Sequence, residues 1–140
     1  MMHTNPPQLP RKLINQLLHL AQLSPEHEIC GLISLQPLHT YHCYPITNTA
    51  KQSQHQFLLD SSEHIAAMKT MREQNETLFA IYHSHPHAAA IPSLSDIQLA
   101  AYPDALYLII SLNTKGILVL RGYRINQQHA IEIPLELTEY

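Results

Sequence analysis

Cysteine is scarce in this sequence, and the two thiols are not at a spacing typical of metal or redox motifs. Only Cys30 and Cys43 occur among the 140 residues, and they form no C-x-x-C motif. A disulfide framework or a cysteine-rich zinc knuckle needs more thiols at closer spacing. Both kinds of protein are therefore excluded, and we expect the two cysteines to pack as small apolar residues in the core.

The sequence also lacks long runs of like charge. Its 8 basic and 11 acidic residues are scattered along the chain and give a formal net charge of −3. A protein that binds nucleic acid usually presents a basic stripe that neutralises phosphates. We therefore expect no nucleic acid among the partners of this protein.

No apolar run is long enough to cross a membrane. The longest runs, at residues 105–110 and 117–120, fall far short of the roughly 20 residues that a membrane helix needs. Residues 1–11 are polar and rich in proline, unlike the apolar centre of a secretory signal. We therefore expect no membrane association and a cytoplasmic location.

The remaining composition is typical of a folded domain. Apolar residues make up 45% of the chain and charged residues 14%, a balance that distinguishes folded proteins from disordered ones. A chain of this length has the size of one ordinary domain, and neither a repeat nor a linker interrupts it. The sequence predicts a single domain over residues 1–140.

Three segments have helical patterns. Apolar residues recur every three or four positions in the first two, and side chains that cap a helix precede the second and third, Asp60 with Glu63 and then Ser93. The sequence therefore predicts helices over residues 10–23, 60–75 and 94–102.

Strands are expected wherever short apolar or alternating segments occur between turn residues. These segments are residues 29–34, 41–46, 56–59, 78–83, 106–112, 117–125 and 130–135. Residues Asn113 to Gly116 predict a hairpin turn between two of them. Because strands and helices do not alternate strictly, we expect an α+β fold, a mixed sheet with helices packed on it.

Histidine is frequent, and one pair is placed where a metal could bind. With 11 histidines in the chain, chance alone produces about one H-x-H pair, so the pair itself carries little weight. His83 and His85, however, stand at the end of an apolar strand, where residues two apart point to the same face. Asp96 falls in the first turn of the third predicted helix, where the helix dipole favours a carboxylate.

Two imidazoles and one carboxylate are a ligand set for catalytic zinc. Three protein ligands leave a tetrahedral Zn²⁺ one open position for water, whereas structural zinc is usually closed by four. Zinc lowers the pKa of that water from about 15.7 toward roughly 7, which produces hydroxide near neutral pH. The mechanism also needs a general base, for which Glu28 is the candidate, although spacing alone does not select Glu28 over Glu26.

Together these residues resemble the signature of the JAMM (JAB/MPN+) zinc metallopeptidases. The matching residues are Glu28-x-Cys30-Gly31, then His83-x-His85-Pro86, six residues, Ser93, two residues and Asp96. The resemblance implies a curved mixed sheet flanked by helices. It implies further that His83, His85 and Asp96 bind zinc, that Glu28 acts as acid and base, and that Ser93 stabilises the oxyanion.

A second and less specific likeness concerns the substrate. Residues 102–111 and 121–125 resemble the short bacterial members of this family, which act on ubiquitin-like sulfur-carrier proteins. The resemblance implies hydrolysis of a peptide or isopeptide bond at the C-terminal Gly-Gly tail of such a carrier, for example with release of cysteine. Eukaryotic deubiquitinating relatives carry insertions that hold ubiquitin and its linkage partner, whereas the hairpin predicted at residues 113–116 is tight, which argues against chain-linkage specificity.

Each site residue also has an ordinary structural explanation. Ser93 and Asp96 could simply cap a helix, Glu28 could be a surface residue before a strand, and the two histidines could belong to a histidine-rich chain. Only the complete motif favours the catalytic interpretation.

Two other kinds of function are alternatives to the peptidase. Family members that lack the ligands serve as non-catalytic binding or scaffold modules, and the intact ligand set argues against that role. A zinc deaminase would need a P-C-x-x-C segment, which the sequence does not contain.

Neighbouring residues with reactive side chains are given lesser roles. His87 lies beyond Pro86, so we expect it at the rim of the site. Ser84 should point to the opposite face of the strand, which argues against a serine nucleophile. Cys30 lies in an apolar run with no polar neighbour to lower its pKa, so we expect it in the core.

Overall fold

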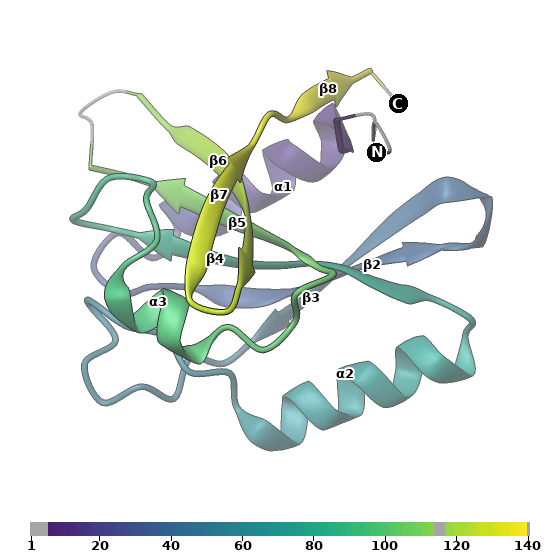
Figure 1. Cartoon of the computed structure of the whole chain (residues 1–140), viewed down its shortest axis with the longest axis horizontal. Coiled ribbons are helices and arrows are strands. Elements are labelled where there is room, and N and C mark those ends of the chain that lie inside the picture. Colours follow the sequence, from purple (N-terminus) through teal and green to yellow (C-terminus); the bar gives the residue numbers. More distant parts are fainter. Residues whose placement is uncertain (1–5, 114–116, 140) are drawn as a thin grey trace.

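A mixed six-stranded sheet forms the centre of the protein. The computed structural model describes residues 6–113 and 117–139, so most of the predicted 113–116 turn lies outside the described residues. The strand order is β3-β2-β4-β5-β6-β7, and only β4 and β5 run parallel (Figure 1). The strands are β2 Cys30–Gln36, β3 Thr40–Ile46, β4 Thr77–His85, β5 Leu106–Ser111, β6 Val119–Asn126 and β7 His129–Ile133. The predicted α+β fold with a mixed sheet is confirmed.

Helices cover both faces of this sheet (Figure 1). On one face lies α1 (Arg11–Gln22), whose Leu13, Leu17 and Ala21 are buried against Tyr82 and Leu108 of the sheet. The opposite face carries α2 (Ser61–Glu73) and α3 (Leu94–Leu99). Its core combines residues of α2 with alternate residues of the strands, namely Ala67, Met71, Leu32, Ile81 and Ile109. The histidines of β4 share this second face, because His83 and His85 follow Ile81 at intervals of two.

The two ends of the described chain pair with each other. Strand β1 (Gln8–Pro10) runs parallel to β8 (Glu136–Thr138) in a separate two-stranded sheet, which no local sequence pattern predicted. The short helix η1 (Pro37–His39) connects β2 to β3.

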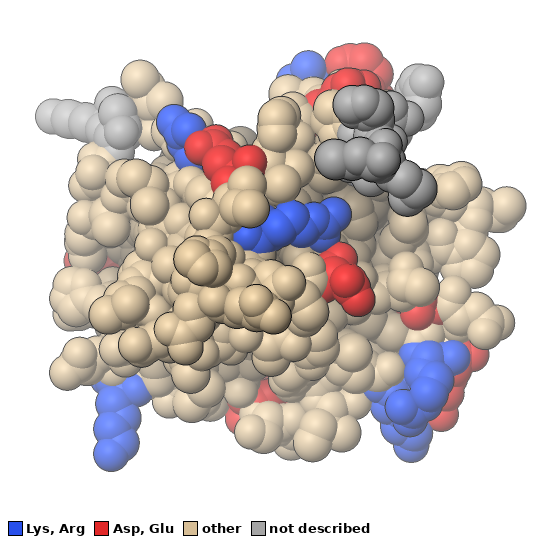
Figure 2. All heavy atoms as spheres, viewed as in Figure 1, with Lys and Arg blue, Asp and Glu red and all other residues tan. Residues whose placement is uncertain are grey.

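No helix among the described residues is long and apolar enough to cross a membrane. Figure 2 shows charged side chains scattered over the face in view, without a basic stripe among the residues drawn there.

The strand predicted at residues 56–59 is wrong. This segment makes only one isolated bridge, between Asn48 and Leu59. The backbone groups of Leu58 bond to Asn48 and Thr49 instead: its N–H donates to Asn48 Oδ1, and its carbonyl accepts from the Thr49 amide. An apolar pattern produced the prediction, but no neighbouring strand is available to extend the pairing.

Several predicted boundaries also shift. The predicted helix 94–102 ends at Leu99, because Ala100 is extended and the Tyr107 hydroxyl accepts from the N–H groups of Ala101 and Tyr102. The strand predicted at residues 78–83 continues to His85, so both histidines belong to β4. The strand predicted at residues 117–125 begins at Val119.

Gly31 permits a close approach between β2 and β4. It pairs with Tyr82 across the two strands, and a Cβ added at Gly31 would overlap the Tyr82 ring and hydroxyl as well as the Tyr44 carbonyl oxygen. Any larger residue would displace this fully buried tyrosine. A glycine in the Glu28-x-Cys30-Gly31 motif is therefore required for packing of the strand that follows Glu28.

Candidate active site

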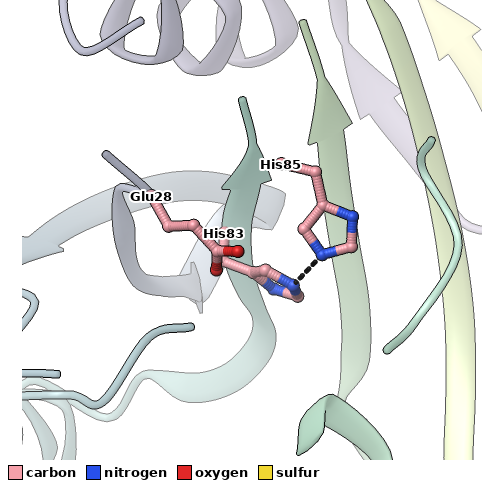
Figure 3. A group of neighbouring side chains, drawn as sticks. All are labelled: Glu28, His83 and His85. Atoms are coloured by element: carbon pink, nitrogen blue, oxygen red, sulfur yellow. Dashed lines mark hydrogen bonds between the residues drawn. The ribbon is translucent and has the colours of Figure 1, made fainter. Parts of the chain in front are cut away.

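Strand β4 delivers two imidazoles to one point. Both side chains are buried, and His83 Nε2 lies 3.1 Å from His85 Nε2 (Figure 3). The register places His83 opposite Cys30 of β2 and Ile109 of β5. Hydrogen bonding on both sides of β4 therefore fixes the backbone from which the two rings project.

A reciprocal cap at the start of α3 aims Asp96 at the same point. The Asp96 amide donates to Ser93 Oγ at 3.0 Å, and the Ser93 amide donates to Asp96 Oδ2 at 2.9 Å. Such a capping box fixes both side chains at the helix terminus. Asp96 Oδ2 lies 3.0 Å from His83 Nε2 and 3.1 Å from His85 Nε2.

The three converging atoms fit a metal ion better than a hydrogen-bond network. An imidazole Nε2 carries either one proton or one lone pair, so each nitrogen can serve only one neighbour well. Here each lies at nearly the same distance from two neighbours. A tetrahedral ion with bonds of about 2.0–2.1 Å separates its ligands by roughly 3.3 Å, close to the observed triangle. His83, His85 and Asp96 therefore fit the group that the sequence predicts.

Glu28 approaches the site from the segment that precedes β2 (Figure 3). Ligand atoms of Glu28, His83 and His85 lie within 4.8 Å of one another, and Glu28 is only 4% exposed. Its Oε1 is buried without a hydrogen-bond partner among the described residues. Two carboxylates therefore flank the imidazoles. Asp96 is the better third ligand, because its Oδ2 contacts both nitrogens directly.

Ser84 holds the Glu28 segment against β4. Its Oγ accepts from the Ile29 amide at 2.9 Å, and its own amide donates to the Ile29 carbonyl at 3.1 Å. The hydroxyl is thus engaged on the far side of the strand from the two imidazoles, which agrees with the prediction that it is no nucleophile. Cys30 is buried as predicted, and burial raises the pKa of its thiol to about 12.

The two carboxyl groups have opposite electrostatic surroundings. Burial raises the pKa of Glu28 to about 8; the Asp96 charge acts in the same direction and His85 opposes it. Burial would also raise the pKa of Asp96, but hydrogen bonds from His83, His85 and the Ser93 amide hold it well below its usual range. Asp96 is therefore ionised at neutral pH, whereas Glu28 can exchange a proton there.

The two imidazoles also differ. Burial lowers the pKa of His83, and the nearby Asp96 only partly offsets this effect. Burial acts in the same direction on His85, but bonds to Asp96 and to the Ala89 carbonyl outweigh it and raise its pKa. A neutral imidazole is the form that binds a metal, so His83 is in the ligating form over the wider pH range.

Three carbonyl groups anchor the loop between the histidines and Ser93. His85 Nδ1 lies 2.7 Å from the Ala89 oxygen, and Ser111 Oγ donates to the Ala88 oxygen at 2.6 Å. The Tyr123 hydroxyl donates to the next carbonyl, that of Ala90. The sequence did not single out Ser111 or Tyr123. A signal for Ser111 was its place at the end of β5, the parallel neighbour of β4.

Phe57 is a further contact that the sequence did not reveal. Its ring stacks on that of His83, with centroids 4.3 Å apart and an angle of 23° between the planes. His87, by contrast, is exposed at the rim as predicted, with Nε2 3.4 Å from the exposed Glu26. Glu26 and Glu28, which spacing could not separate, are thus distinguished by burial.

A cavity of about 260 Å³ opens beside Asp96. Ile81, Tyr107 and Phe57 are among the residues that line it. Leu58 and Leu99, each more than half exposed, also line it. An apolar space therefore adjoins the converging polar groups, as in many ligand sites.

Comparison with known proteins identifies the family of this chain. Residues 10–125 match the family described as prokaryotic homologs of the JAB domain. The chain is 33% identical over 132 residues to the CysO-cysteine peptidase of Mycobacterium tuberculosis. The aligned region covers 91% of this chain and 88% of that protein.

Two solved structures are similar over most of the chain. The solution structure of a Desulfitobacterium hafniense protein superposes with a TM-score of 0.81 at 29% identity, and covers 95% of this chain and 93% of that one. A structure described as a JAMM metalloprotease-like zinc site in the proteasome and signalosome shares the fold, with a TM-score of 0.55 at 17% identity and coverage of 96% and 100%. This chain belongs to the prokaryotic JAB-domain family.

Proposed function

We propose that this protein is a zinc-dependent peptidase that cleaves a peptide or isopeptide bond at the C-terminal Gly-Gly tail of a ubiquitin-like sulfur-carrier protein. The single observation that carries the proposal is the triangle formed by His83 Nε2, His85 Nε2 and Asp96 Oδ2 beside Glu28, whose buried Oε1 has no hydrogen-bond partner in the described part of the chain. A relative at 33% identity is named a CysO-cysteine peptidase, which supports hydrolysis of a bond between a protein and cysteine.

The proposed roles follow from the surroundings of each residue. His83, His85 and Asp96 would hold the ion, which when bound supplies a Lewis acid and lowers the pKa of water. Glu28 accepts a proton from the attacking water and returns it to the leaving amine. Its raised pKa, about 8, suits a group that must both gain and lose a proton near neutral pH.

Ser93 can donate to the oxyanion while it caps α3. Its Oγ uses one lone pair to accept from the Asp96 amide at 3.0 Å. The hydroxyl proton is not used in that bond, so it is available to a negatively charged oxygen. A donor fixed in this way needs little reorganisation as charge develops in the transition state.

The shape beside the metal ligands supports an extended substrate tail. Glycine residues have no side chains to obstruct their approach to the buried polar groups, and the apolar cavity beside Asp96 can receive a side chain further along the tail. Leu58 and Leu99 extend the apolar surface to the exterior. A folded domain with a flexible Gly-Gly end meets these requirements.

The test is to incubate the purified, zinc-loaded protein with a carrier that bears one cysteine on its terminal glycine, and to read intact masses. We expect the conjugate to lose the mass of one cysteine residue. After a chelator removes the zinc, the conjugate should stay intact, and cleavage should resume when zinc is returned. An intact conjugate in the presence of bound zinc would remove the substrate proposal. Binding of the conjugate without turnover would instead indicate a non-catalytic scaffold module.

A further inference from the structure

The segment from Thr47 to Asp60 holds Glu28 by both of its peptide groups. The Glu28 amide donates to the Ser53 carbonyl at 2.7 Å, and the Glu28 carbonyl accepts from Asn48 Nδ2 at 3.0 Å. The backbone on each side of the buried carboxyl is therefore fixed by a segment about 20 residues further along the chain. No element of the sheet supplies these two bonds.

All four hydrogen-bonding positions of the Asn48 amide are used. Nδ2 donates to the carbonyls of Glu28 and Gln56, each at 3.0 Å, while Oδ1 accepts from the amides of Ala50 at 3.0 Å and Leu58 at 2.9 Å. Reversing the amide would place oxygen against two carbonyls and nitrogen against two N–H groups, so the neighbours fix its orientation. Asn48 is thus a rigid junction between the Glu28 segment and residues 56–58.

Phe57 lies between Gln56 and Leu58, whose carbonyl and amide both bond to the Asn48 side chain. Its ring stacks on His83, whose Nδ1 is buried without a partner among the described residues. His85 is different, because its Nδ1 bonds to the Ala89 carbonyl. Metal-binding histidines are usually oriented by a hydrogen bond at the second ring nitrogen, and for His83 the stacked Phe57 takes the place of that bond.

We propose that Asn48 is a positioning residue that places the general base and the His83 ring correctly relative to each other. Its Nδ2 donates to the carbonyls of Glu28 and Gln56, and its Oδ1 accepts from the Leu58 amide, so the same side chain fixes Glu28 and the segment that presses Phe57 on His83. Asn48 touches neither the metal ligands nor the reacting atoms. The proposal extends the proposed function to a residue outside the family motif.

The main variant is Asn48→Asp, which keeps the shape and both acceptor bonds but removes both donors. We expect kcat for conjugate cleavage to fall about 10- to 100-fold, as when other outer partners of a metal site are lost, with little change in KM. The absorption spectrum of the Co²⁺-substituted protein should also change, because the His83 ring is no longer held in place.

Thr49→Val is the matched control. It removes a bond from Thr49 Oγ1 to the Leu58 carbonyl in the same segment, at 3.1 Å, but no contact to Glu28. This variant should retain the kcat and the Co²⁺ spectrum of the original protein. Equal losses in both variants would assign Asn48 to general loop stability and overturn the proposal.

A second pair of variants covers the case in which Asn48→Asp does not fold. Phe57→Leu should weaken zinc binding roughly 10-fold in a competition assay, and Phe57→Tyr, which keeps the stacked ring, should restore it. Unchanged zinc affinity in Phe57→Leu would overturn the role of the stack. The metal measurements need no substrate, so they still decide this proposal if the original protein cleaves no carrier conjugate.

Discussion

The two faces of the central sheet carry very different side chains, although the same strands supply both. On the α1 face, β4 contributes Ala80 and Tyr82 to an apolar core. On the other face the same strand passes from Ile81 to His83 and His85, where polar groups replace the core. The α1 face therefore serves mainly to stabilise the fold, whereas the opposite face also holds the buried polar groups of the candidate site. Mutations on the two faces should separate stability from activity.

Asp96→Ala should have the largest effect, because it removes the carboxylate that contacts both His83 and His85. We expect zinc affinity to fall by more than the roughly 10- to 100-fold typical of outer partners, and turnover to be lost with the metal. Elemental analysis after gel filtration, with parallel activity assays, measures both. Unaltered zinc content would remove Asp96 from the ligand set.

Glu28→Gln should separate chemistry from metal binding. The amide keeps the shape of the side chain but cannot accept the proton of the attacking water. We therefore expect turnover to fall by about 10²- to 10⁴-fold while zinc remains bound. Glu26→Gln is the control, since that side chain is exposed. If Glu28→Gln retains activity, the base must be another residue.

Leu17→Ala should show the opposite behaviour on the α1 face. Leu17 is completely buried there, so its truncation leaves a cavity and costs roughly 2–5 kcal/mol in the free energy of unfolding. Chemical denaturation measures this loss. At a temperature where the variant stays folded, zinc content and turnover should match those of the original protein. A specific loss of zinc would mean that the two faces are coupled.

A pH dependence of the metal-free protein is also expected from the buried Glu28 carboxyl. The folded-state pKa of Glu28 is raised from 4.5 to about 8, so the folded state favours the protonated carboxyl. Its contribution to stability is fully present below about pH 4.5 and is lost as pH rises through 8. Glu28→Gln lacks this titration. Between pH 5 and 8 the original protein should therefore lose thermal stability relative to the variant, and parallel melting curves would contradict the assignment.

Much of the fold followed from local pattern. The helical spacing of Leu13, Leu17 and Ala21 predicted α1, and the alternation along β4 placed His83 and His85 on one face. The prediction for residues 56–59 failed because an apolar pattern does not reveal whether a partner strand is present. There the side chain of Asn48 takes the hydrogen bonds that a neighbouring strand would have made.

The sequence by itself determined the parts of the site that depend on near neighbours: two imidazoles at i and i+2 on a strand, and Ser93 and Asp96 three residues apart in a capping box. These contacts need only the periodicity of one strand and the free amides of one helix terminus. Tertiary structure alone decided that Glu28 is buried beside them and that Glu26 faces solvent beside His87. Pairing between β2 and β4 and the bonds from Asn48 and Ser53 bring Glu28 to residues 55 or more positions away. Such contacts depend on how the chain folds back on itself, which no local spacing specifies.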